Sequence, residues 1–526
     1  MGDFAEMRVS RSDIARMAGV KRPAVTNWER RHLGFPDPVG GGDLDVFRAD
    51  QVLEWLSGRT IPANALEPGE PTGATYGDRF RAALGGGRRS GGLLTAVEQL
   101  AVRDAERLRG PWRMSGYLYL LLFLVFVQSQ DPERWSAYVE NPGQAPRDLD
   151  FGEMSGQSQV SHLVRFLDRS PPASRGESRQ AFDRLLTLFQ DSDARASDEY
   201  FTPPSVSRVM AGALAGSGFA ASRLHDPFCR TGELLGAYLD AVAEQGRKAP
   251  TGVSGRALGE GAQRLARMNL ELHGAERPLV LLGPRLPSMP FDGDLSGRFD
   301  AVITNPPFGA VGARQAPPPH YWRYGTPRSQ EFDWLQYVVS CLDAEGRAAV
   351  LMPAGAGFRG SADRETRARL VEDGVVECVM ALPTHLFELT SIQTHVWFLR
   401  APRGRPAGVL FVDGADLGGM ATRTRRALSD ADVDRLVRAY TSWRGTGHGG
   451  QPGLSRAVDP QEIAAQDHRL EPALYVREPL PSADAFQDRT AARNRLAQLS
   501  AQLRELHVEA EAVDGLAEER LRRYGL

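Results

Sequence analysis

The amino-acid sequence predicts an α/β fold in which a mainly parallel β-sheet is covered by helices on both faces. Between about residues 198 and 415, short apolar segments alternate with amphipathic segments, which is typical of strands joined by crossover helices. With 42% hydrophobic and 25% charged residues, the chain of 526 residues has an ordinary globular composition and room for two to four domains. The apolar segments are SRLHDPF, GVSGRAL, LVLLG, FDAVITNPPF, GRAAVLMP, VVECVMALP and THVWFLR.

Charge and cysteine content narrow the range of functions. The formal net charge of -3 excludes a basic field over the whole chain, so any nucleic-acid surface is local. Cys229, Cys341 and Cys378 show no CxxC spacing, so we expect neither a metal site nor disulfides, and a reducing cytoplasm is the default location. The N-terminus has no apolar signal segment, and the apolar run 117–127 is too short to span a bilayer, so no membrane partner is expected.

Residues 1–58 are predicted to form a small DNA-binding unit. Ser12 and Asp13 can cap a first helix, Gly19 allows a tight turn, and Pro23 suits the first turn of a second helix. This spacing resembles winged helix-turn-helix domains of the MerR and excisionase type, which implies DNA binding. The alternative is a helical hairpin that binds protein or only packs. The residues expected to contact DNA are Lys21, Arg22, Thr26, Asn27, Arg30 and Arg31.

Composition divides the rest of the chain into four parts. Residues 59–90 are rich in Gly, Pro and Thr, which predicts a linker. Residues 91–197 are predicted to be a helical domain around the buried run 117–127, and residues 198–415 carry the sheet. Residues 416–526 are predicted to be a polar helical tail, in which leucines at three-four spacing indicate a docked helix or a short coiled coil.

One strand of the predicted sheet ends in an unusual corner. The apolar run 301–303 leads directly into Asn305, Pro306, Pro307 and Phe308. The two prolines exclude a regular helix or a central strand at this point. Because ligands of parallel sheets bind at the carboxyl ends of the strands, this corner is predicted to lie where chemistry is done.

The corner suits methyl transfer to a planar amine. The exocyclic amine of a nucleobase is a poor nucleophile, because its lone pair is delocalised into the ring. The side-chain carbonyl of Asn305 and the fixed backbone carbonyl of Pro306 can accept its hydrogens, and Phe308 offers a face for an extruded base. Adenine N6 and cytosine N4 fit this chemistry equally well. The alternative is a rigid loop with a structural role only, since Asn-Pro commonly begins turns.

Several segments together resemble one known family. Asn-Pro-Pro-Phe is similar to the catalytic motif of amino-methylating DNA methyltransferases, and EYFTPPSVSRVMAGAL from Glu199 resembles the opening of type I restriction-modification M subunits. HDPFCRTGELL from His225 is similar to the family turn Asp-Pro-Ala-Cys-Gly-Thr-Gly-Gly, and the resemblance covers roughly residues 100–480. It implies a Rossmann-like class I methyltransferase fold and transfer of a methyl group from S-adenosylmethionine to adenine N6.

The resemblance also implies a biological setting and a cofactor site. Its partners would be double-stranded DNA, a specificity subunit and a restriction or translocase subunit, in a restriction-modification or phage-defence system. The positions that match the family's cofactor contacts are Tyr200, Phe201, Thr202, Pro203, Asp226, Pro227, Phe228, Thr231 and Gly232, together with Arg230 and Glu260 as candidate substitutes.

Four positions depart from the family pattern. Arg230 and Glu233 stand where the family has glycines, Ala257 replaces an acid at the end of the second strand, and Pro284 replaces an aspartate after the third. Arg230 can block the cofactor or pair with its carboxylate, and Glu260 can substitute for the missing acid. We therefore expect a divergent but active methyltransferase, with a non-catalytic DNA-binding regulator or scaffold on a degenerate fold as the alternative.

Overall fold

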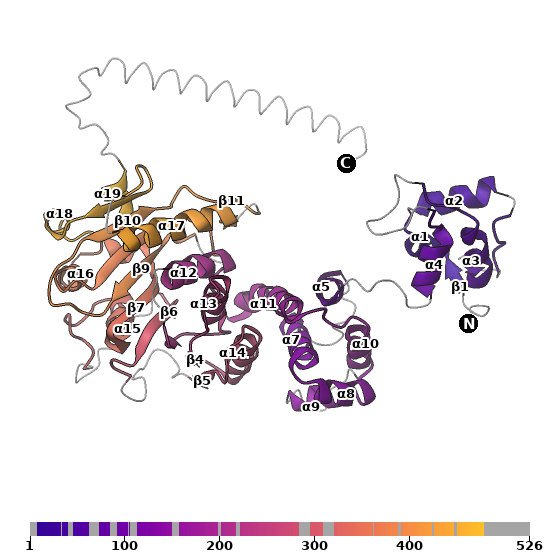
Figure 1. Cartoon of the computed structure of the whole chain (residues 1–526), viewed down its shortest axis with the longest axis horizontal. Helices are drawn as coiled ribbons and strands as arrows, with labels where there is room; N and C mark the ends of the chain where they lie inside the picture. The colour runs from indigo at the N-terminus through magenta and orange to yellow at the C-terminus, as the bar shows by residue number, and fades with distance from the viewer. Residues whose placement is uncertain are drawn as a thin grey trace, which may run out of the picture.

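A computed structural model gives the architecture of the chain (Figure 1). It describes residues 8–20, 22–32, 34–39, 46–62, 73–84, 92–103, 105, 113–149, 157–197, 201–216, 221–282, 295–308, 320–360, 362–387, 391–422, 425–446 and 450–477.

The N-terminal unit has a core of its own. Gly19, at a φ of +67°, makes the turn between its first two helices, and Phe47 and Phe80 are fully buried between the elements. The segment 59–90, predicted as a linker, contains a helix that packs on the first and third helices, so this unit extends past residue 58. The glycines and prolines around this helix led to the prediction of a linker, although Phe80 is a buried core residue. The elements are β1 (Arg8–Ser10), α1 (Arg11–Ala18), α2 (Arg22–Arg31), β2 (Val46–Arg48), α3 (Ala49–Ser57) and α4 (Tyr76–Leu84), with β1 and β2 antiparallel.

A helical unit follows, built around the apolar segment that the sequence predicts to be a buried helix. Helix α7 is buried on every side from Tyr117 to Val125, which confirms that prediction. None of the helices described here is long and apolar enough to cross a membrane. The elements are α5 (Leu93–Glu98), the π-helical η3 (Gln99–Arg103), α7 (Met114–Gln130), α8 (Pro132–Glu140), α9 (Gln144–Asp148), α10 (Gln157–Asp168) and α11 (Arg175–Ser197).

The predicted mainly parallel sheet is confirmed. Its nine strands run in the order β13-β10-β8-β9-β7-β6-β3-β4-β5. Only β9, between β7 and β8, and the edge strand β13 run antiparallel to their neighbours among these described strands. The strands are β3 (Arg223–Asp226), β4 (Gly252–Ala257), β5 (Leu279–Leu282), β6 (Phe299–Thr304), β7 (Leu342–Pro353), β8 (Val376–Ala381), β9 (Thr394–Arg400), β10 (Val409–Asp413) and β13 (Ser455–Val458).

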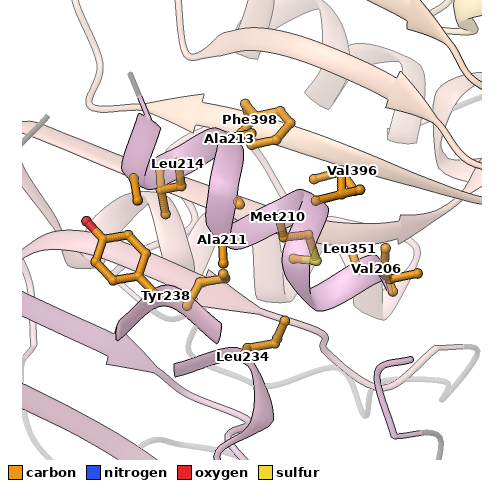
Figure 2. Packing of buried hydrophobic residues seen from close by; sticks show 14 of the residues in the cluster. Val206, Met210, Ala211, Ala213, Leu214, Leu234, Tyr238, Leu351, Val396 and Phe398 are labelled. Atoms are coloured by element: carbon orange, nitrogen blue, oxygen red, sulfur yellow. The ribbon is translucent and has the colours of Figure 1, made fainter. Parts of the chain in front are cut away.

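Helices cover both faces of this sheet and enclose two cores. Figure 2 shows α12 packed by Val206 and Met210 against Leu351 of β7 and Val396 of β9. The next residues along β7 and β9 belong to the core under α15 and α16, because successive strand side chains point to opposite faces. The helices are α12 (Pro204–Gly216), α13 (Glu233–Glu244), α14 (Glu260–Leu272), α15 (Gln330–Cys341), η4 (Ala354–Gly357) and α16 (Ala362–Glu372).

The segment after residue 416 is not simply a helical tail. Strand β13 pairs with β10 and completes the sheet, so the sheet domain continues well beyond residue 415. Its four residues bury only Ser455 and Val458, which is too short a pattern to mark a strand in the sequence. The leucine repeat near the C-terminus lies outside the described residues. The remaining elements are β11 (Gly419–Met420), β12 (Arg426–Ala427), α17 (Asp430–Thr446), α18 (Pro460–Ala465) and α19 (Pro472–Val476).

Candidate active site

The sheet topology brings two sequence motifs together. From β3 the chain crosses to its neighbour β4 and then to β5, and it returns to β6 on the opposite side of β3. Such a reversal opens a crevice at the carboxyl ends of the two central strands, where α/β proteins bind ligands. The turn 226–232 follows β3 and the corner 305–308 follows β6, so both border this crevice.

Asp226 joins the two motifs. Its carboxylate accepts a hydrogen bond of 2.6 Å from the Thr304 hydroxyl at the end of β6. The same Oδ1 accepts a hydrogen bond of 2.9 Å from the backbone N–H of Phe228 in its own turn. Complete burial raises the pKa of Asp226 to about 7, although these two hydrogen bonds favour the ionised form. Asp226 therefore fixes the spacing of the two loops.

The Asn305 amide is held in one orientation from the opposite wall. Asn305 is only 2% exposed, and its Nδ2 donates a hydrogen bond of 3.1 Å to the Thr202 hydroxyl, just before α12. This contact orients the amide, and with it the carbonyl oxygen that the sequence predicts to be an acceptor. Thr202 thus directly orients the asparagine that is predicted to be catalytic.

Glu233 organises the wall behind Thr202. Its two carboxylate oxygens accept hydrogen bonds from the Thr202 N–H, at 3.4 Å, and from the Thr231 hydroxyl, at 2.9 Å. Gln190 of α11 donates to the Thr231 hydroxyl at 2.9 Å, and Asn269 of α14 donates to the Thr231 carbonyl at 3.0 Å. The departure from glycine at 233 therefore serves a structural role. Sequence reasoning missed Gln190 and Asn269, because they lie 41 and 38 residues from Thr231 in the sequence and only folding brings them to it.

The Phe308 side chain is only partly exposed to solvent. Pro306 is buried, whereas Pro307 and Phe308 are half-buried. The Phe308 ring packs against the core cluster formed by α12, α13 and the sheet. The sheet core therefore covers part of the ring that the sequence predicts to be a stacking face.

Arg230 lies directly against the corner 305–308. The residue is only 8% exposed and has a left-handed backbone, with φ at +43°. Its Nη1 donates a hydrogen bond of 2.8 Å to the backbone carbonyl of Asn305. The side chain thus bridges from the β3 turn to the β6 corner.

A cavity of about 280 Å³ adjoins this bridge, at the lower end of ligand-site volumes. Gly259 and Gly261 border it after β4, and a Cβ placed on either would meet no heavy atom within 4 Å. Apolar walls, open glycines and the polar groups of Arg230 and Thr231 suit a nucleoside with a charged tail, as S-adenosylmethionine is. The lining residues are Tyr119, Phe189, Phe201, Arg230, Thr231, Leu258, Gly259, Gly261, Ala262 and Leu265.

The predicted cofactor residues lie in several different environments. Phe201, Arg230 and Thr231 line this cavity, whereas Glu260 is exposed at the start of α14 and does not. Phe228 packs edge-on against Trp334, with ring centroids 4.9 Å apart, on the side of the second core. Pro203, Asp226 and Pro227 are buried beneath the loops, Gly232 makes the turn into α13 with φ at +78°, and Ala257 is fully buried. Tyr200 and Pro284 lie outside the described residues.

A larger cavity, of about 770 Å³, lies behind the same wall. One face each of α11, α12, α13 and α17 borders it, and Thr202 and Glu233 stand at its edge. The wall formed by Thr202, Thr231 and Glu233 therefore touches both cavities.

The predicted DNA-binding residues lie on α2. Asn27, Arg30 and Arg31 are exposed and Thr26 is half-buried. Lys21 lies outside the described residues, as does the side chain of Arg22. These exposed groups occupy one short helix of the N-terminal unit.

Replacing Thr202 by Val should slow methyl transfer without weakening cofactor binding. The change keeps the shape of the side chain but removes the oxygen that orients Asn305. We expect kcat to fall about 10- to 100-fold, because small losses of positioning have effects of this size. Steady-state kinetics with varied S-adenosylmethionine would measure it, with Thr202→Ser as the control that keeps the oxygen. A rise in KM at unchanged kcat would show that Thr202 only binds cofactor.

Comparison with known proteins identifies relatives for this arrangement. Residues 178–482 match the family model described as N-6 DNA Methylase. The chain is 26% identical over 327 residues to the type I restriction enzyme HindI methylase subunit of Haemophilus influenzae. It is 24% identical over 336 residues to the MjaVIII methylase subunit of Methanocaldococcus jannaschii. These matches cover 59% and 60% of this chain, and 72% and 56% of the respective relatives.

Solved structures share the fold. The type I restriction-modification methyltransferase subunit of Streptococcus thermophilus superposes with a TM-score of 0.58 at 20% identity, over 73% of this chain and 99% of that one. A modification subunit of a putative type I restriction enzyme from Vibrio vulnificus gives 0.52 at 18% identity, over 70% and 93%. At these identities the likeness extends to the architecture of the sheet and its helices.

Proposed function

The chain belongs to the N-6 DNA methylase family, and we propose that it transfers a methyl group from S-adenosylmethionine to the exocyclic N6 of adenine in double-stranded DNA. One observation carries the proposal: Asn305 stands at the switch point of the sheet, oriented by Thr202, beside a cavity suited to a nucleoside. The Haemophilus and Methanocaldococcus relatives, both type I restriction enzyme methylase subunits, support the same activity.

The corner supplies acceptors rather than a charged base. The Asn305 Oδ1 and the Pro306 carbonyl accept the two hydrogens of the amine, which localises its lone pair. When bound, S-adenosylmethionine would supply the methyl group as an electrophilic carbon on its sulfonium. The amine nitrogen would bond to that carbon as the carbon–sulfur bond breaks, and it would then release one proton to water. Phe308 packs on one side against the sheet core and offers the other side of its ring to the extruded base.

The cradle for the cofactor is proposed from this chain's own residues. Phe201, Thr231, Leu258 and Gly259 would border the nucleoside, and Arg230 would face its charged end. Neither Ala257 nor the exposed Glu260 offers an acid to the cavity. Each missing hydrogen bond costs about 1 kcal/mol, so we expect weaker cofactor binding than in relatives that keep the acid.

The missing acid at the cofactor cavity favours the second candidate, a non-catalytic DNA-binding regulator or scaffold on a degenerate methyltransferase fold. Expression in a host that lacks adenine methylation, together with the products of neighbouring genes, separates the two. Digestion of the host DNA to nucleosides should yield N6-methyl-2′-deoxyadenosine with the wild-type chain and none with Asn305→Ala. Equal nucleoside profiles for the two chains would favour the scaffold, and N4-methylcytosine would move the substrate to cytosine.

We also propose that the N-terminal unit is a winged helix-turn-helix that binds DNA through α2. A specificity subunit and a restriction or translocase subunit would complete the assembly. The names of the relatives, as methylase subunits of type I restriction enzymes, support an assembly of several subunits. Sequence choice would then come from this unit, from the specificity subunit, or from both.

Removing the charges of Arg30 and Arg31 together should weaken DNA binding. If both contact phosphates, affinity should fall at least about 10-fold, and the slope of log K against log salt should drop by about two. Fluorescence anisotropy with duplex DNA at several salt concentrations measures both quantities. Lys248→Ala serves as a control, because Lys248 is exposed in the loop that precedes β4 and does not belong to the N-terminal unit. An unchanged slope would contradict DNA binding through α2.

A further inference from the structure

We propose that Arg230 is a specificity-determining latch: its guanidinium holds the catalytic corner until the carboxylate of a ligand takes the place of the Asn305 carbonyl. The inference rests on the proposed function and names the group by which this site selects its cofactor. Ligands with a carboxylate would open the way from the cavity to Asn305, and nucleosides without one would leave it closed.

The position of the side chain is the first argument. Arg230 lines the 280 Å³ cavity and also bonds to the Asn305 carbonyl at 2.8 Å, so it stands between the cavity and the corner. A ligand in the cavity that reaches toward Asn305 has to pass this guanidinium. The left-handed backbone at Arg230 aims the side chain across the crevice, at a position where glycine would fit without strain.

The charge of the side chain is the second argument. A guanidinium has five N–H donors, and within the described part of the chain Arg230 directs one of them to a neutral oxygen, the Asn305 carbonyl. Among the described residues, no carboxylate forms an ion pair with Arg230: Asp226 bonds to Thr304 and Glu233 bonds to Thr231. Burial raises the pKa of Asp226 and the charge of Arg230 lowers it without a direct contact, so the buried guanidinium keeps donors for an incoming anion.

The competition between acceptors gives the latch its direction. A carboxylate binds guanidinium through two parallel, charge-assisted hydrogen bonds, whereas the Asn305 carbonyl offers one neutral bond. Exchange therefore favours the carboxylate and frees the corner. The exchange also pairs the Arg230 guanidinium with the ligand carboxylate, which reduces the repulsion between the guanidinium and a nearby sulfonium.

Calorimetry with two closely related probes tests the proposal. S-adenosylhomocysteine carries the carboxylate, and its decarboxylated analogue keeps the nucleoside, thioether and ammonium. The full-length wild-type chain should prefer S-adenosylhomocysteine at least 30-fold, and Arg230→Met should reduce this preference to less than threefold. A preference that Arg230→Met leaves unchanged would overturn the latch while the proposed function stands.

Two glycine variants separate the side chain from the backbone. Arg230→Gly removes the guanidinium and relieves the left-handed strain, so it should fold and bind both probes alike. Arg277→Gly relieves the same strain at an exposed residue with φ at +52°, and it should keep the wild-type preference. If only the Arg230 variants bind, Arg230 is a permanent plug and the exchange is wrong. If no chain binds either probe at millimolar concentration, both the latch and the proposed function fail.

Discussion

Replacing Asn305 by Ala should reduce methyl transfer by about three orders of magnitude. The change deletes the side-chain acceptor that we assign to the amine, and losses of single preorganised polar groups in active sites are of this size. The backbone carbonyl of residue 305 remains, so the Arg230 contact and the fold should persist. Transfer of labelled methyl groups to unmethylated DNA, with saturating cofactor and partner subunits, measures the loss.

The matched variant Asn305→Asp keeps an acceptor oxygen at the same place. The Thr202 hydroxyl can reverse its role and donate to the new carboxylate, so the side chain should hold its orientation. We expect Asn305→Asp to retain far more activity than Asn305→Ala, with similar binding of S-adenosylhomocysteine in both. Equal loss in the two variants would show that the amide N–H, rather than the carbonyl, is what the reaction uses.

Asp226 should make the protein less stable as pH rises from about 4 to 7. Burial raises its folded pKa to about 7, whereas the unfolded chain has the ordinary value of 3.8. The unfolded state therefore loses this proton from about pH 4, and the folded state keeps it until about pH 7. Over that interval unfolding becomes easier by on the order of a few kcal/mol, and the effect levels off above it.

Urea unfolding of the wild-type chain and Asp226→Asn at pH 4.5 and 7.5 tests this effect. The variant cannot ionise at 226, so its stability relative to wild type should rise between the two pH values. Asp432→Asn is the control: the Ser429 hydrogen bond lowers the pKa of Asp432, so Asp432 is ionised in both states across this window. A constant difference between wild type and Asp226→Asn would contradict a raised pKa.

The sequence predicted those parts of the molecule that local patterns encode. Strand β6 and the corner after it could be predicted from the sequence, because an apolar run ends at an Asn-Pro-Pro sequence that no regular element accommodates. The buried helix α7 could be predicted because eleven consecutive apolar residues are too few to span a membrane and too many to lie on a solvent-exposed surface. The mainly parallel sheet followed from the alternation of the segments.

Features set by distant contacts were not predictable in the same way. Helix α4 depends on Phe80 filling a core made by residues before 58, and β13 depends on pairing with β10. Phe308 is held by the sheet core, which its own neighbours in sequence do not reveal. The site assignments themselves stay predictions, and Arg230 is the clearest case, since only folding brings it to the Asn305 carbonyl.

Hydrogen exchange with bound S-adenosylhomocysteine tests most directly whether the loops after β3 and β4 form the cofactor site. Mass spectrometry of the full-length chain should show slower exchange in peptides that cover 228–232 and 258–262 when the ligand is added. Protection confined to the faces of α11, α12 and α13 around the 770 Å³ cavity would place the ligand elsewhere. That result, or no protection anywhere at saturating ligand, would contradict the account.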